Sequence, residues 1–115
     1  LMTALSAGLS AFCHDLATQR MLDRVVILCF TEFGRRVQEN ASRGTDHGAA
    51  GPLFLLGSQI RGGLYGGLPS LTELDQGDLQ MQVDFRQVYA TVLDRWLGVP
   101  APEILGEHFA HLPLL

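Results

Sequence analysis

Residues with the chemistry of a metal site are concentrated between positions 32 and 47. Asp46 and His47 stand side by side in Gly44-Thr-Asp-His-Gly48, where the glycines let the backbone turn freely. A carboxylate oxygen and an imidazole nitrogen together suit divalent cations such as Zn²⁺ or Mn²⁺. The alternative, and the commoner use of such a short segment, is a plain surface turn.

Glu32 follows the most apolar segment of the chain, residues 25–30. Ligands of open parallel sheets bind beyond the carboxyl ends of the strands, so a carboxylate there is a candidate ligand or catalytic group. It could equally be a solvated side chain or a partner of Arg35. Arg35 and Arg36 could clamp an anion through paired N–H donors. We favour the alternative, in which they form ion pairs with nearby carboxylates, namely Glu32, Glu39 or Asp46.

Other reactive residue types form no recognisable site. The remaining histidines, His14, His108 and His111, have no acidic neighbour that completes a ligand set and are interpreted as surface or partly packed side chains. The two cysteines are too few for a disulfide framework. Cys29 is expected to be a buried free thiol, with a bridge to Cys13 as the less favoured alternative. The chain has no nucleophile elbow, no P-loop and no dinucleotide-binding glycine motif.

The elements that must position these residues follow from hydrophobic periodicity. Apolar residues spaced by three and four predict a helix over residues 3–21. Residues 25–30 predict a strand that is covered on both faces, as in a parallel sheet between helices. The polar, glycine-punctuated residues 38–51 predict a loop. A second short strand is expected at 53–56, and the five glycines between 57 and 67 predict a further loop.

The clearest predicted element is a helix over residues 84–97. Its apolar residues recur with spacings of three and four, and Asp84 with Gln87 fits a variant of the capping box at its start. Gly98 suits the position just after the helix. The tail is expected to hold one or two helical turns around residues 103–110.

Composition narrows the class of protein. The chain has 115 residues, of which 47% are apolar and 17% are charged, against roughly 25% charged in an average domain. The net charge is −4 and all eight basic residues are arginine, which disfavours nucleic acid as a partner. The longest apolar run has six residues, far short of the ~20 that cross a bilayer, so no membrane span is expected.

Four segments taken together resemble a known family. They are Leu22–Arg36 (LDRVVILCFTEFGRR), Gly44-Thr-Asp-His-Gly48, Gly62-Gly-Leu-Tyr-Gly66 and Val83–Gly98, in that order. This combination is similar to the C-terminal third of the bacterial domain-of-unknown-function 1501 family, of the alkaline phosphatase and sulfatase-like superfamily. The resemblance implies an α/β fold: a C-terminal fragment of an alkaline-phosphatase-like sandwich, with a few-stranded sheet and flanking helices. Residues 1–115 are then expected to be a single partial domain whose N-terminal part is absent.

The resemblance also implies a chemistry. Asp46 and His47 correspond to a pair that holds one ion of a two-metal site, and Glu32 corresponds in place to a ligand of the other. The expected cofactor is a divalent metal (Zn, Mn, Mg or Ca), and Arg35 would neutralise a phosphate or sulfate ester substrate. Arg36 departs from the superfamily pattern, which has a histidine at that position. The nucleophile of the superfamily lies in the part that this chain lacks, so no catalytic residue is assigned.

Two functions are therefore expected as alternatives. The first is part of a metal-dependent phosphate- or sulfate-ester hydrolase, holding some of the metal ligands but inactive by itself. The second is a non-catalytic exported or surface module that keeps the superfamily fold. Because a small sheet leaves its edges open, self-association through an exposed sheet edge is expected. The resemblance points to the periplasm or cell envelope, although the sequence itself leaves the compartment unknown.

Overall fold

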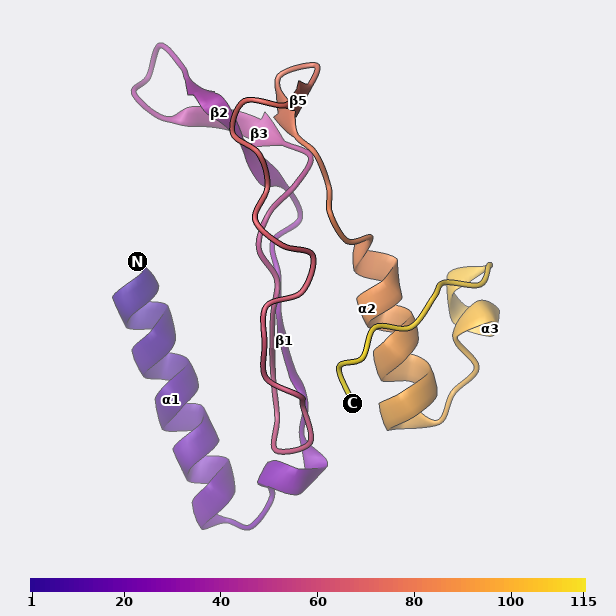
Figure 1. Cartoon of the computed structure of the whole chain (residues 1–115). Coiled ribbons are helices and arrows are strands. Elements are labelled where there is room, and N and C mark those ends of the chain that lie inside the picture. Colours follow the sequence, from indigo (N-terminus) through magenta and orange to yellow (C-terminus); the bar gives the residue numbers. More distant parts are fainter. The chain divides into compact units, whose positions relative to one another are not determined.

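The computed structural model describes all 115 residues and divides the chain into two compact units (Figure 1). Unit 1 consists of Leu1–Cys29 and Phe54–Ile60. Unit 2 consists of Phe30–Leu53 and Arg61–Leu115. All four residues that the sequence predicts to form a site therefore belong to unit 2.

Unit 1 contains one long helix and one small sheet. Helix α1 (Met2–Thr18) is followed by a 3₁₀ turn at Leu22–Arg24. Strands β1 (Ile27–Cys29) and β4 (Phe54–Leu56) pair with each other. The predicted helix and both predicted strands are thus present, and each is shorter than its apolar segment.

The direction of strand pairing in unit 1 differs from the prediction. β1 and β4 run antiparallel, with Ile27 opposite Leu56 and Cys29 opposite Phe54. The side chains of β1 are half-buried and not enclosed on both faces. An apolar run identifies a strand, but it cannot select the partner or the direction, which depend on contacts far along the chain.

Unit 2 begins with two hairpins. β2 (Gly34–Glu39) pairs antiparallel with β3 (Thr45–Gly48), with a register shift between Arg35 and Glu39. β5 (Leu74–Asp75) and β6 (Asp78–Leu79) form a much tighter hairpin. β6 lies against β2, and Figure 1 shows β5 beside β2 and β3.

The predicted loop over residues 38–51 is largely the β2–β3 hairpin. Its turn is organised by Asn40, whose Oδ1 accepts hydrogen bonds from the backbone amides of Ser42 (3.0 Å) and Gly44 (3.1 Å). Arg43 takes the left-handed conformation at the turn, with φ 59°. The polar composition that indicated a loop instead reflects strands whose side chains are mostly exposed.

The helix predicted over 84–97 is confirmed. α2 (Phe85–Thr91) continues as a π-helical segment (Val92–Leu97), and Gly98 ends it with φ 65°. Asp84 is the N-cap: its Oδ1 accepts a hydrogen bond from the backbone amide of Arg86 at 2.9 Å. Val88, Ala90 and Thr91 form the buried face of α2.

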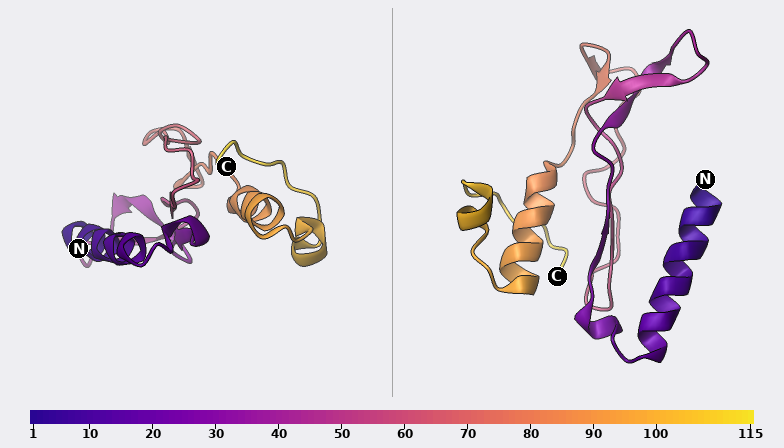
Figure 2. Two further views of the ribbon diagram at one scale, coloured as in Figure 1. Left: turned by 90° about the horizontal axis from the view of Figure 1, so that it is seen from below. Right: turned by 180° about the vertical axis from the view of Figure 1, so that it is seen from behind.

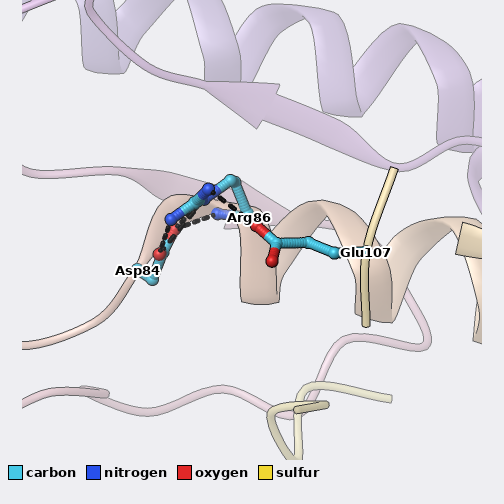
Figure 3. A network of polar contacts seen from close by, with 3 residues as sticks. All are labelled: Asp84, Arg86 and Glu107. Carbon is cyan, nitrogen blue, oxygen red and sulfur yellow. Dashed lines mark hydrogen bonds and ion pairs between the residues drawn. The ribbon is translucent and has the colours of Figure 1, made fainter. Parts of the chain in front are cut away.

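The C-terminal tail packs along α2. The Arg86 guanidinium bonds to Asp84 (2.7 Å) and Glu107 (3.2 Å), the network drawn in Figure 3. After α3 (Ala101–Leu105), the tail passes close to α2 in the views of Figure 2. There the backbone amide of Leu112 donates to Oγ1 of Thr91 at 2.9 Å. The helical turn expected at 103–110 is therefore present slightly earlier, as α3.

The fold class is α/β, with three helices and three two-stranded antiparallel sheets. These sheets are separate, and they do not form the layered sandwich that the resemblance implies. No helix is both long and apolar enough to span a membrane. Cys13 and Cys29 are both free thiols, and both are half-buried.

Candidate functional site

Three of the four predicted site residues lie on the β2–β3 hairpin. Arg35 is on β2, while Asp46 and His47 are neighbours on β3. Arg35 and His47 are directly opposite each other in the antiparallel register. Glu32 lies two residues before β2 begins. The structure therefore gathers Arg35, Asp46 and His47 on one small element.

The imidazole of His47 stacks on the ring of Phe33. The two ring centroids are 3.6 Å apart and the planes differ by only 14°. The guanidinium carbon of Arg35 lies 5.4 Å from the same Phe33 ring. We call Phe33, Arg35 and His47 the stacked cluster. It holds a cationic and an imidazole group around one aromatic ring, and stacking holds the imidazole in a defined orientation.

Arg35 also links the two strands directly. Its Nη1 donates a hydrogen bond to the backbone carbonyl of Thr45 at 2.7 Å. The ion pairs favoured from the sequence, with Glu32, Glu39 or Asp46, are not among the four ion pairs of the structure. A guanidinium has several further N–H donors, so Arg35 keeps the capacity to bind an anion.

Asp46 has a different environment from His47. Its Oδ1 accepts a hydrogen bond from the side-chain amide of Asn40 at 3.0 Å, near the turn of the hairpin. Successive side chains of a strand point to opposite faces, and Asp46 and His47 are successive residues of β3. As they lie, the two side chains are therefore not directed toward one common ion.

The chain alone does not form a closed metal site. No group of three or more His, Cys, Asp or Glu side chains converges anywhere in the structure. The Glu32 side chain is exposed and takes part in none of the ion pairs. The carboxylate and imidazole donors fit a divalent cation in kind. There are too few of these donors for a closed site, since a structural zinc site has four protein ligands.

Asp78 is a residue that the sequence interpretation missed. Its Oδ2 forms an ion pair with Nη2 of Arg36 at 3.3 Å, and its Oδ1 accepts a hydrogen bond from the backbone amide of Ala49 at 3.2 Å. The signal that could have located it is Gln76-Gly77 before Asp78. A two-residue hairpin turn of type I′ needs positive φ at both positions, and Gln76 and Gly77 have φ 50° and 87°. Of the two, only Gly77 is a residue type that favours this turn.

His111 also has a partner that the sequence did not reveal. Its Nε2 lies 2.6 Å from Oδ2 of Asp94, which is on the π-helical segment. The pKa of the Asp94 carboxyl is lowered, first by the hydrogen bond from the backbone amide of Ala101 and then by the one with His111. At the other end of α2, the Arg86 side chain lowers the pKa of Asp84 by hydrogen bonding.

Comparison with known proteins yields one family. The profile of the family described as "Protein of unknown function (DUF1501)" matches residues 1–107. No curated protein and no solved structure shows significant similarity to the chain.

Proposed function

Because the chain belongs to the DUF1501 family, we propose that it takes part in the metal-dependent hydrolysis of phosphate or sulfate esters. The proposal follows from the resemblance of four ordered segments to the alkaline phosphatase and sulfatase-like superfamily. In this proposal the chain is the C-terminal part of a larger sandwich. Each sheet has only two strands, so one edge of every strand is unpaired and could pair with a further strand. This supports completion by other strands of the sandwich.

Each site residue has a proposed role. Asp46 and His47 supply ligands to one divalent cation, which requires residues 45–48 to leave the strand conformation that now separates their side chains. Glu32 faces a second cation, and Arg35 binds the anionic group of the substrate. Cations in such a site activate a nucleophile and stabilise the leaving oxygen. The residues of this chain bind and orient the cations and the ester, but they supply no nucleophile. The remaining metal ligands come from residues outside the β2–β3 hairpin.

The observation that carries the proposal is the pairing of Arg35 with His47 across the hairpin, with Asp46 next to His47. An anion-binding group and two potential metal ligands are thereby held on one element. All three side chains are exposed, so a cation or an ester can reach them.

Metal titration tests the proposal. Calorimetric titration of the longer protein that completes the sandwich, with Zn²⁺ and with Mn²⁺, is expected to show saturable binding. Asp46→Asn and His47→Gln should each weaken it by at least about tenfold, the loss typical of disturbed metal-site residues. Asp23→Asn, in the 3₁₀ turn of unit 1, is the control and should leave binding unchanged. Absence of any saturable site in this longer protein would contradict the proposal.

A second candidate function is a non-catalytic exported or surface module of the periplasm or cell envelope. The observation that favours it is Arg36, which stands where the superfamily pattern has a histidine and which forms an ion pair with Asp78. A guanidinium stays protonated and has no lone pair to offer a cation, so Arg36 cannot replace a histidine ligand. This candidate predicts no saturable metal binding together with an intact β2–β3 hairpin.

A further inference from the structure

The Asp78 carboxylate contacts β2 and the residue that directly follows β3, at one end of the hairpin that carries the candidate site. Oδ2 pairs with the Arg36 guanidinium, which belongs to β2, and Oδ1 accepts from the amide of Ala49, the residue that follows β3. We propose that Asp78 is a positioning residue. It holds the open end of the β2–β3 hairpin, where Gly34 pairs with Gly48, and thereby fixes the face on which His47 lies. The inference concerns hairpin geometry and stands independently of the proposed function.

The hairpin needs such an anchor because its own ladder is irregular. The register shifts between Arg35 and Glu39, so the pairing at the turn does not determine the pairing at the open end. A slip of one residue moves every side chain of a strand to the other face. At β3 such a slip would exchange the faces of Asp46 and His47 and would break the stack of His47 on Phe33.

Gly48 makes the approach of Asp78 possible. A Cβ atom at this position would lie 2.9 Å from Oδ1 of Asp78 and 2.7 Å from the carbonyl carbon of Arg35. The glycine after Asp46 and His47 therefore leaves the space that the carboxylate occupies. This requirement for Gly48 is distinct from the flexible turn that the sequence indicated.

The β5–β6 hairpin in turn places Asp78. Gln76 and Gly77 both have positive φ, as in the tight turn whose twist matches that of paired strands. Asp78 follows this turn directly and pairs with Asp75 across the hairpin. The Asp78 side chain is 22% exposed and that of Arg36 is 41% exposed. An ion pair this exposed supplies only part of the anchor, and the hydrogen bond from the amide of Ala49 supplies the rest.

Nuclear magnetic resonance of the metal-free chain tests the inference. Stacking on Phe33 should displace the ring C–H resonances of His47, and Phe33→Leu defines their position without the stack. Asp78→Ala should move these resonances most of the way to the Phe33→Leu position. Asp78→Asn, which keeps an acceptor for Ala49, and Arg36→Gln should each move them part of the way. Asp75→Asn, in the same hairpin, should leave them unchanged.

Circular dichroism separates positioning from folding. The helical signal, which sums over α1, α2 and α3, should be unchanged in Asp78→Ala, because the hydrogen bonds of the Asp78 side chain go to Arg36 and Ala49 and not to a helix. If Asp78→Ala loses the helical signal, the variant does not fold, and the inference is tested with Asp78→Asn and Arg36→Gln instead. His47 resonances that stay in the unmodified position in every folded variant would overturn the inference. Since no metal is present, this outcome is separate from the result of the metal titration.

Discussion

Asp84 and Asp94 stand near the two ends of α2 and its π-helical continuation, and each accepts a hydrogen bond from a backbone amide. Asp84 accepts from Arg86 at the start of the helix, and Asp94 accepts from Ala101 at 2.7 Å, where α3 begins. Such bonds satisfy amides that have no partner within a helix. At the scale of single residues, these two carboxylates therefore determine where helices start.

Replacing Asp84 tests its role as an N-cap. Asp84→Ala is expected to lower the free energy of unfolding of unit 2 by about 1 kcal/mol, because the amide of Arg86 loses its acceptor. Urea unfolding followed by the fluorescence of Trp96, the single tryptophan, measures this change. Asp84→Asn retains a side-chain oxygen and should recover most of the loss; equal losses in the two variants would contradict capping.

The carboxyl of Asp94 predicts a dependence of stability on pH. Hydrogen bonds from Ala101 and His111 lower its pKa in the folded chain below the ordinary value of 3.8. The unfolded chain therefore binds the proton more tightly, and the stabilisation is complete above the ordinary pKa and lost as the pH falls through the lowered one.

Melting temperatures measured across this acidic range provide the test. The unmodified chain should exceed Asp94→Asn in melting temperature near neutral pH, and the difference should shrink as the pH falls below about 4. A difference that stays constant into the acidic range would show that the charge of Asp94 does not stabilise the fold. Asp75→Asn, whose carboxylate is exposed, serves as the control variant.

The β2–β3 hairpin depends, at the scale of elements, on two glycines with almost no space around them. A Cβ at Gly34 would lie 1.6 Å from the carbonyl oxygen of Ala50, which is a backbone atom and cannot turn away. Gly34 and Gly48 face each other at the open end of the hairpin. The close approach of the strands there therefore excludes any larger residue.

Gly34→Ala is accordingly expected to destabilise unit 2 by about 1–3 kcal/mol, the usual cost of overpacking. Trp96 fluorescence during urea unfolding again measures it. Gly62→Ala is the matched control, because a Cβ there meets nothing within 4 Å. Its effect should stay within about 0.5 kcal/mol. A Gly34→Ala variant as stable as the control would show that the hairpin relaxes around the added methyl group.

Exposed apolar side chains are the feature of the whole molecule with the clearest consequence in solution. In unit 1, Met2 and Phe12 on α1 and Phe54 on β4 are 59%, 47% and 41% exposed. β1 and β4 form a sheet of only two strands, and neither strand contains a charge or a proline to protect its open edge. Such edges favour pairing with other chains.

We therefore expect the chain to self-associate. Sedimentation velocity should show an average mass that rises with protein concentration. Phe54→Lys, which places a charge on β4, should reduce this rise, because charged residues on edge strands oppose pairing. Val37→Lys, at an exposed apolar position of β2 in unit 2, should leave it nearly unchanged. A chain that stays monomeric at every concentration would contradict the expectation.

The sequence by itself determined the features that depend on neighbouring residues. The helix from Asp84 to Gly98 was predicted with its cap and its end, because spacing, capping and a left-handed glycine are properties of a few consecutive residues. The strands at 27–29 and 54–56 were located for the same reason. The sequence also identified side chains whose chemistry suits a cation or an anion, because that chemistry is a property of the residue type.

Only the tertiary structure decided which distant residues meet. It paired β1 with β4 antiparallel, joined Arg36 to Asp78 across 42 positions, and joined Asp94 to His111 across 17. It also placed Asp46 and His47 within a strand, where alternation separates their side chains. Strand direction and long-range ion pairs depend on contacts between distant parts of the chain, and no local pattern of residues specifies those contacts.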